Sequence, residues 1–405
     1  MKNKTYDFII IGAGIMGLSI AYKLITNNPK LKIAIIEKEK NVALHASGKN
    51  SGVLHSGFFN SIDSLKAKFT KSGNEQLKEF CKHYKLKINF CGRIIVASNE
   101  KEFNDLCEFK HRGDLNNIES IWISQQEAHE IDPNAKIYNK ALFSPTTATI
   151  DPIEICYTLL QILKDRGIQF FFETEYLRKS NSRPVGITTT NGNYEGEMII
   201  NAAGLYADKI AKDFGLSQEY TLLPFKEIYL KTSLPWPEIK TNIYCVPNLK
   251  NPFLSVHFIK TVNNHIKIGS MYIPAFWREN YTLFERFKLS EFKEILWYEI
   301  MLFLSNSCDF RNLTFKEIKK INKNHLISQA KKLVNNLTAE QYRRWETPGI
   351  HPQLLKKSTL KLVDDFKIEG GIEHNSIHVL NATNPAFTCS FSFADWIIAE
   401  FIYKS

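Results

Sequence analysis

Residues 6–17 read YDFIIIGAGIMG, and this stretch decides the fold. The apolar run before the first glycine is typical of a buried parallel strand. Gly12, Gly14 and Gly17 follow it as the pattern G-x-G-x-x-G. In this pattern the first glycine permits a tight turn, the second lets the backbone approach a pyrophosphate, and the third lets a helix pack closely on the strand. The stretch therefore predicts the strand-to-helix turn of a dinucleotide-binding fold.

The residues that follow complete this unit. Apolar positions at helical spacing predict a helix over Ile15–Thr26, and a second apolar run predicts a strand over Lys32–Glu37. The helix would point its free N–H groups at a diphosphate, and Glu37, 25 residues after Gly12, would accept the hydroxyls of a ribose. Enzymes that pass electrons from NADH or NADPH to a flavin usually carry two such folds, whereas only one fingerprint occurs here. The single copy favours FAD as the resident cofactor.

The remaining chain predicts an α/β (α+β) protein of two domains. Strands over Met198–Gly204 and His378–Asn381 have the apolar character of the first strand, whereas residues 225–275 alternate apolar and polar as an antiparallel sheet does. Residues 283–345 are Lys-rich and predicted to be helical. We expect a Rossmann-type FAD-binding domain that is discontinuous in sequence, with an inserted antiparallel-sheet substrate domain. The first comprises residues 1–75, 145–215 and 350–405, and the second comprises residues 76–144 and 216–349.

The composition is that of a globular protein, with 44% hydrophobic and 23% charged residues among 405. The formal net charge is +10, but the lysines are scattered without a nucleic-acid-binding motif, so we expect no nucleic acid partner. Seven cysteines without a C-x-x-C pair indicate reduced thiols and no metal site. No apolar run approaches the roughly 18 residues that span a bilayer, so we expect a cytoplasmic protein, with attachment to the inner face of the membrane as the alternative. The oligomeric state stays open.

A second loop, residues 45–57, reads HASGKNSGVLHSG. Its small residues and side-chain donors suit a backbone wrapped around an extended anion and a flat ring. This loop, followed by SLKA at residues 64–67, resembles the L-2-hydroxyglutarate oxidase/dehydrogenase family, which belongs to the D-amino-acid-oxidase-like flavoproteins. Further segments match this family in order along essentially the whole chain, at residues 91–93 (CGR), 203–208 (AGLYAD), 224–225 (PF) with Tyr229, 252–257 (PFLSVH), 363–366 (VDDF) and 381–386 (NATNPA).

Three places depart from the family pattern. Lys49 stands where the family usually has His, and His351 stands where Arg is expected. Residues 226–229, which usually read Arg-Gly-Glu-Tyr, read KEIY here. The resemblance therefore supports the oxidation chemistry more firmly than the substrate.

Oxidation of a 2-hydroxy acid requires a base for the hydroxyl proton, cations for the carboxylate, and donors for the negative charge that develops on the flavin. Histidine is the natural base because its reference pKa lies near neutral pH. The resemblance points to His55 and His257. His55 lies in the loop 45–57, called the flavin loop below, and His257 lies in the predicted antiparallel sheet 225–275 of the substrate domain. We expect His257 to be the base. The candidate substrate-binding residues are Lys226, Tyr229, Lys49 and His351, with Arg278 as a further cation.

The predicted cofactor-binding residues come from the glycine turn, the end of the second strand, the 45–57 loop, and segments farther along the chain. They are Gly12, Gly14, Ile15, Met16, Gly17, Glu37, Lys38, Ser47, Asn50, Ser51, Gly52, Val53, Tyr176, Ala203, Gly204, Asn384, Pro385, Ala386 and Thr388. The last helix, which begins near Pro385, would direct its N–H groups and dipole at the negative edge of the flavin.

These observations predict an FAD-dependent oxidoreductase that acts on the CH–OH group of a small L-2-hydroxy acid by hydride transfer to flavin N5. L-2-hydroxyglutarate, which gives 2-oxoglutarate, is the first candidate substrate, and the electrons would pass to oxygen or a quinone. In the quinone case, the apolar segment 290–305 beside Lys-rich helices would lie on a membrane surface; core packing is its simpler interpretation. The alternatives are an amine or amino-acid oxidase of the glycine/sarcosine oxidase type, and an FAD-binding protein without this turnover.

Overall fold

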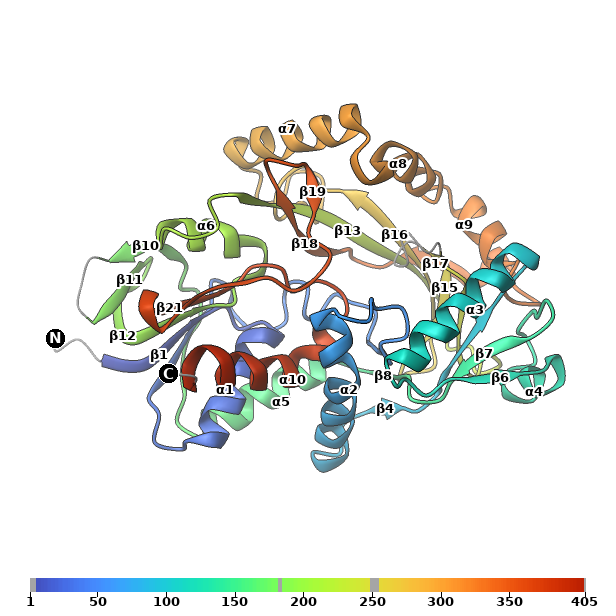
Figure 1. The fold of residues 1–405 in the computed structure, drawn as a ribbon, viewed down its shortest axis with the longest axis horizontal. Coiled ribbons are helices and arrows are strands. Elements are labelled where there is room, and N and C mark those ends of the chain that lie inside the picture. The colour runs from blue at the N-terminus through green and yellow to red at the C-terminus, as the bar shows by residue number, and fades with distance from the viewer. Residues whose placement is uncertain (1–4, 181–183, 248–254, 404–405) are drawn as a thin grey trace.

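The computed structural model describes residues 5–180, 184–247 and 255–403. Two large sheets lie next to each other along the long axis of the molecule, with helices on their outer faces (Figure 1). The family-like residues 252–254 lie outside the described ranges. A sheet whose central strands are parallel but which also contains antiparallel pairs, together with a second, almost wholly antiparallel sheet, confirms the predicted mixed α/β fold class.

The first sheet has eight strands and contains both ends of the chain. Its central path runs β10-β11-β12-β1-β2-β9, while β21 pairs with the second half of β12, and β20 pairs with β21. The strands are β1 (Thr5–Ile11), β2 (Ile33–Ile36), β9 (Gln169–Phe171), β10 (Tyr176–Ser180), β11 (Val185–Thr189), β12 (Gly192–Asn201), β20 (Ile368–Gly371) and β21 (Ser376–Val379). Strand β1 pairs in parallel with β2 and β12, and β12 pairs in parallel with β21.

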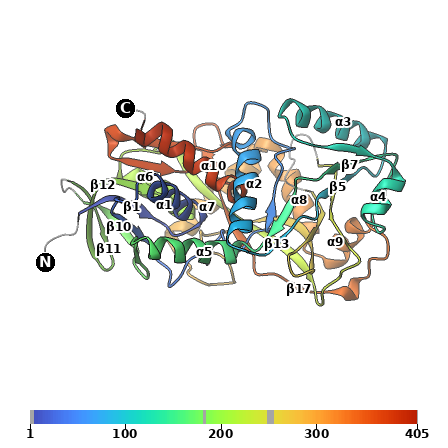
Figure 2. The ribbon, with the colours of Figure 1, turned by 90° about the horizontal axis from the view of Figure 1, so that it is seen from below.

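Helices cover both faces of this sheet because its central strands are apolar on both sides. On one face lie α1 (Ile15–Asn27), α5 (Pro152–Asp165) and α10 (Ala386–Ile398), with α2 (Leu65–His83) against α10 (Figures 1 and 2). The other face carries the short helix α6 (Ala207–Asp213). Asp151 caps α5, accepting the N–H groups of Ile153 and Glu154, which fixes where that helix begins.

The second sheet has ten strands in the order β19-β18-β13-β16-β15-β14-β5-β7-β6, with β17 also paired to β13. The strands are β5 (Arg93–Val96), β6 (Ile121–Ile123), β7 (Ala141–Ser144), β13 (Tyr220–Thr232), β14 (Asn242–Cys245), β15 (His257–Lys260), β16 (Ile266–Pro274), β17 (Tyr342–Trp345), β18 (Gly349–Lys356) and β19 (Lys361–Leu362). All pairs are antiparallel except β14 with β5. Strand β19 and all of β18 except Gly349 fall within residues 350–405, which were predicted to belong to the FAD-binding domain, but both strands pair in this second sheet before the chain returns to the first sheet at β20.

Short elements and helices complete the fold. A small sheet of β3 (Val53–Leu54), β8 (Ala148–Ile150) and β4 (Ile88–Asn89) joins the two halves. The second half carries α3 (Glu100–Leu115), α4 (Gln125–Ile131), α7 (Leu289–Ser305), α8 (Phe310–Lys319) and α9 (Lys323–Ala330). The predicted helical region 283–345 is thus three helices followed by a strand, β17. In the described part of the chain, no helix is both long and apolar enough to cross a bilayer.

Candidate functional site

Two adjoining cavities lie where the two sheets meet. The larger has a volume of about 690 Å³ and extends along the β1–α1 turn, the end of β2, the 45–55 loop and the start of α10. The smaller has a volume of about 40 Å³ and lies against the second sheet. Both cavities are lined by Ser51, His55, Glu227, Asn384 and Pro385. A ligand in the larger cavity would therefore lie directly beside a ligand in the smaller one.

The three glycines of the β1–α1 turn have different surroundings. Gly12 has φ of +103°, and a Cβ there would lie 2.6 Å from the carbonyl oxygen of Ala202. A Cβ on Gly17 would lie 2.0 Å from the carbonyl oxygen of Gly12, so these two glycines are required by the fold itself. A Cβ on Gly14 would meet only Ser47 Oγ, at 3.1 Å. Gly14 therefore leaves backbone open towards the larger cavity, as a pyrophosphate site requires.

Glu37 directly follows β2 and lies next to the β1–α1 turn. One of its carboxylate oxygens accepts the N–H of Ala13 at 2.8 Å, and the other accepts the N–H of Glu39 at 2.9 Å. Burial raises the pKa of this carboxyl. Its side chain lines the larger cavity, which is the position that a ribose-binding acid needs.

The predicted cofactor residues converge on the larger cavity. All of them line it except Gly17 and Gly52, which shape the backbone instead. A Cβ on Gly52 would lie 2.7 Å from the carbonyl oxygen of Ile150. Lining residues that the sequence prediction missed include His45, Thr174, Tyr206, Lys209 and Leu380. His45 begins the 45–57 loop and Tyr206 lies in the family-like segment 203–208, whereas only the folded chain brings Thr174, Lys209 and Leu380 to the cavity.

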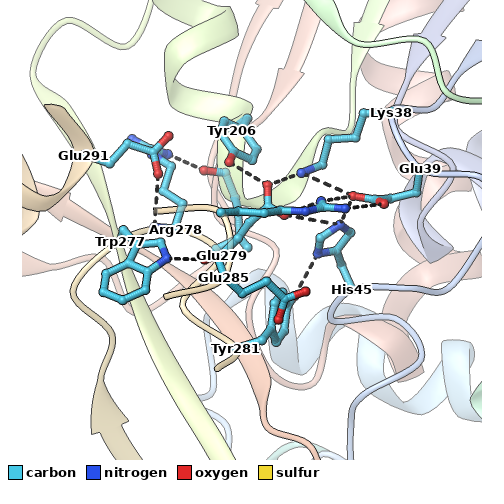
Figure 3. A network of polar contacts seen from close by, with 12 residues as sticks. Lys38, Glu39, His45, Tyr206, Trp277, Arg278, Glu279, Tyr281, Glu285 and Glu291 are labelled. Carbon is cyan, nitrogen blue, oxygen red and sulfur yellow. Dashed lines mark hydrogen bonds and ion pairs between the residues drawn. The ribbon is translucent and has the colours of Figure 1, made fainter. Parts of the chain in front are cut away.

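A network of charged side chains ties the segment between β16 and α7 to the loop after β2 (Figure 3). The carboxylate of Glu279 forms ion pairs with Lys38 and Arg286, and Arg286 forms a further ion pair with Glu39. His45 Nε2 lies 2.9 Å from Glu39 Oε1. Glu39, His45 and Glu279 approach one another as metal ligands would, but Lys38 and Arg286 already balance the two carboxylates. This network closes one edge of the larger cavity, which Lys38 and His45 line.

His257 lies in the smaller cavity with its ring orientation fixed. Its Nδ1 is 2.9 Å from the carbonyl oxygen of Ser255, so Nδ1 carries the proton and Nε2 keeps a lone pair. The ring stacks on Tyr244, with centroids 4.3 Å apart and planes 21° apart. Burial lowers the pKa of His257 to about 4. The imidazole is therefore neutral near pH 7 and can accept a proton.

His55 lines both cavities. Its backbone N–H donates to Thr388 Oγ1 at 3.1 Å, which ties the flavin loop to α10. Burial, together with the positive charge of Arg93, lowers the pKa of His55 to about 3. The two predicted bases thus share the smaller cavity, and His55 lies at the boundary with the larger one.

Glu227 is a buried carboxylate that also lines both cavities. It accepts the hydroxyls of Tyr229 and Tyr272, each at 2.6 Å, and it lies 2.7 Å from His351 Nε2. Burial disfavours its charge, but the charge and hydrogen bond of His351 and the two tyrosine hydroxyls outweigh burial and lower the pKa of Glu227 to about 2. The site therefore contains a negative charge.

The four predicted substrate residues divide into two groups. Tyr229 lines the smaller cavity and His351 the larger one. Lys226 and Lys49 line neither cavity. Lys226 neighbours Glu227 on β13, and adjacent strand residues point to opposite faces; the Lys49 ammonium lies 3.6 Å from the ring centroid of Tyr281.

Arg278 binds Asp208 through both terminal nitrogens, at 2.6 and 2.9 Å. Its charge is already compensated there. The cation that does line the smaller cavity is Arg93. It belongs to the family-like segment 91–93, to which the sequence alone attached no role.

Comparisons with known proteins agree with this geometry. The chain is 32% identical over 98% of its length to the mitochondrial L-2-hydroxyglutarate dehydrogenase of Caenorhabditis briggsae, of which 94% is covered. It is 31% identical over 98% of its length to that of Bos taurus, of which 89% is covered. The FAD-bound L-alpha-glycerophosphate oxidase of Mycoplasma pneumoniae has the same fold, with a TM-score of 0.74 at 20% identity over 97% of this chain and 93% of that one. The family model described as FAD dependent oxidoreductase matches residues 7–399, and the chain therefore belongs to that family.

Proposed function

We propose that this protein oxidises a small L-2-hydroxy acid, with L-2-hydroxyglutarate as the first candidate. The observation that carries the proposal is that two neutral imidazoles, His55 and His257, line a small cavity directly beside the larger, dinucleotide-sized one. Removing a hydroxyl proton requires such a base. The relatives named L-2-hydroxyglutarate dehydrogenases support the substrate class.

The larger cavity fits FAD. The open backbone at Gly14 would lie against the pyrophosphate, Glu37 would hold a ribose, and the start of α10 would face the flavin. When bound, FAD supplies the acceptor for the two electrons of the substrate Cα–H bond. The residues of this chain then supply binding, orientation and proton transfer.

His257 is our first candidate for the base. The Ser255 carbonyl holds the proton on Nδ1, so the lone pair of Nε2 stays available for the substrate hydroxyl. Stacking on Tyr244 keeps the ring plane fixed, and a fixed base needs little reorganisation during the reaction. His55 is the second candidate because it lines both cavities.

One observation favours a second function, the oxidation of an amine or amino acid. Glu227 presents a carboxylate with a lowered pKa to both cavities, and such a charge would attract a substrate ammonium group. This reaction would not depend on an imidazole base, because a neutral amine can assist the loss of electrons itself.

Anaerobic bleaching of the flavin separates the two functions. The purified protein would be mixed without oxygen with L-2-hydroxyglutarate, L-lactate, their D-isomers, glycine, sarcosine and L-proline. We expect fast bleaching by an L-2-hydroxy acid and slow or no bleaching by its D-isomer and by the amines. Fast bleaching by an amine alone would replace our proposal by the second function, and a protein that no compound bleaches would refute both.

We also propose that the electrons pass to a quinone at a membrane surface, with oxygen as the alternative acceptor. Helices α7 and α8 lie along one edge of the molecule (Figure 1), and they carry large apolar side chains that are exposed. Trp297 is 60% exposed, Leu304 67% and Phe315 53%, and Leu283 before α7 is 83% exposed. A mixture of exposed aromatic and aliphatic side chains with nearby lysines is typical of helices that lie in a membrane interface.

Co-sedimentation with vesicles tests whether the protein binds a membrane surface through α7. We expect binding to vesicles that contain anionic lipid, weakened by salt because exposed charges are screened within about 8–10 Å at 0.1–0.15 M salt. The variant Trp297→Ser with Leu304→Ser should bind less. Ile153→Ser, at an exposed site on α5, serves as the matched control. Equal binding by both variants would contradict the membrane role of α7.

A further inference from the structure

Arg93 is the first residue of β5 and one of the most deeply buried large side chains in the described structure, at 1% exposure. It lines the smaller cavity together with His55 and His257. Burial lowers the pKa of Arg93, but a guanidinium keeps its charge near neutral pH. Its burial beside two candidate bases therefore requires an explanation.

Arg93 makes no ion pair among the described residues, and the carboxylate of Glu227, which lines the same cavity, is held by His351, Tyr229 and Tyr272 instead. The Nη2 of Arg93 donates to Ser56 Oγ at 3.1 Å, while its Nε is buried without a hydrogen-bond partner. Arg278 differs in this respect: it is equally buried, but it donates two hydrogen bonds to the carboxylate of Asp208. Proteins rarely bury a charge without pairing it. An uncompensated guanidinium that lines a cavity is consequently a site for an anion from outside the chain.

Aromatic rings hold this guanidinium in place. Its Cζ lies 5.0 Å from the ring centroid of Phe59 and 5.1 Å from that of Tyr244, within the range of a cation–π interaction. Rings that cover the faces of a guanidinium leave its N–H edge for hydrogen bonds. That edge is the part that matches a carboxylate with two parallel bonds.

We propose that Arg93 binds the carboxylate of the substrate in the smaller cavity and thereby selects 2-hydroxy acids over uncharged alcohols. This inference rests on the proposed function and adds the residue that recognises the acid. It also replaces Lys49 and Lys226, which line neither cavity, as the principal cation of the site.

The same position connects substrate binding to the base. The positive charge of Arg93 contributes to the lowered pKa of both His55 and His257. A carboxylate bound to the guanidinium would offset that charge, so each imidazole would hold a proton more strongly once an anionic substrate is present. The base would then accept the hydroxyl proton more readily in the complex than in the free protein.

The test compares Arg93→Met, which removes the charge, with Arg93→Lys, which keeps a positive charge but lacks the two parallel N–H groups that bind both oxygens of a carboxylate. Arg112→Met is the matched control, because Arg112 pairs with Glu108 at the surface of α3. FAD content and thermal unfolding are measured first for all three. Binding of pyruvate and 2-oxoglutarate, which cannot donate electrons to the flavin, is then followed through changes in the flavin absorption spectrum.

We expect Arg93→Met to raise the Kd for both 2-oxo acids by roughly 30-fold or more, as truncation of one member of a buried charge pair does. Arg93→Lys should give an intermediate increase, and Arg112→Met should give none. In anaerobic reduction, Arg93→Met should also lose the preference of the wild-type protein for L-lactate over its uncharged amide. Wild-type affinity in an Arg93→Met protein that retains FAD would overturn the inference.

The two proposals can fail separately. If the wild-type flavin is reduced by no 2-hydroxy acid, the proposed function fails, while the binding of 2-oxo acids still decides the role of Arg93. If the wild-type flavin is reduced by an acid and Arg93→Met reacts equally well at low substrate concentration, only the inference about Arg93 fails. A wild-type protein that binds neither 2-oxo acid also refutes the inference.

Discussion

Replacement of His257 by glutamine should slow flavin reduction by a 2-hydroxy acid. Loss of a general base typically costs a factor of about 10² to 10⁴, or roughly 3–5 kcal/mol of transition-state stabilisation. Glutamine places its amide near the position of Nε2, where it can still hydrogen-bond the substrate hydroxyl, but it cannot take up a proton and does not reproduce the 2.9 Å contact of Nδ1 with the Ser255 carbonyl. The substitution therefore removes the basicity while keeping much of the packing.

The pH dependence provides an independent measure of the same residue. Burial lowers the pKa of His257 from 6.5 to about 4, so the imidazole is a competent base above about pH 4 and loses this capacity below it. The acidic limb of kcat/KM should lie near pH 4 for the wild-type protein and disappear in His257→Gln. Folding is linked to the same protonation: between pH 6.5 and 4 the unfolded chain binds a proton that the folded one does not. At about 1.4 kcal/mol per pKa unit, His257 alone should contribute about 3 kcal/mol to the loss of stability on acidification through this window, and His257→Gln should lose less stability than the wild-type protein by that amount.

Stopped-flow reduction without oxygen, at saturating substrate, measures the chemical step directly. His55→Gln is the paired variant, and we expect it to change substrate affinity or the flavin spectrum more than the rate of reduction. A hundredfold loss in His55→Gln with a wild-type rate in His257→Gln would reverse the assignment. Wild-type rates in both variants would refute base catalysis by either imidazole.

Three further outcomes are expected. Gly14→Val should lose FAD but fold with the melting temperature of the wild-type apoprotein, since a Cβ there meets only Ser47 Oγ and bound FAD itself raises the melting temperature; retention of full FAD would contradict the pyrophosphate position. NADH and NADPH should not reduce the flavin at useful rates, because one dinucleotide fingerprint is present, and anaerobic mixing with each would reveal any second site. Burial raises the pKa of Glu299, on α7, to about 8, so its stabilisation of the fold is complete below pH 4.5 and lost as pH rises through 8. Glu299→Gln should accordingly match the wild-type protein in acid and exceed its stability by up to about 5 kcal/mol above pH 8, as urea unfolding would show.

The cofactor half of the molecule could be predicted from sequence because its signals are local. The strand, the glycine turn, the first helix and Glu37 lie within one short segment, and each glycine has its own steric reason there. The His55 and His257 candidates came from family-like segments, and the fold places both of them in the smaller cavity. A motif can be predicted from sequence when its residues lie close together in the chain and each has a known physical role.

The charges of the substrate site could not be predicted because they depend on strand pairing. Glu227 and His351 were two separate departures from the family pattern, at places where Gly and Arg are usual. In the structure β13 and β18 are neighbours, with Phe225 paired to His351, and the two departures form one hydrogen-bonded pair at 2.7 Å. Arg93 likewise gains its meaning only when β5 lies beside β14 and Tyr244. Hydrophobic periodicity in a sequence indicates local secondary structure, and it does not indicate contacts between residues more than a hundred positions apart.

The order in which the walls of the larger cavity are synthesised has a consequence for biosynthesis. Asn384 and Thr388, which line the same cavity as Gly12, are synthesised more than 370 residues after it. The partner strand β21 is also made late, so the parallel sheet remains incomplete until then. A nascent chain that stalls before α10 should have no place to retain the cofactor. FAD should therefore be retained only after α10 has been synthesised, and a premature stop before α10 should yield a colourless protein.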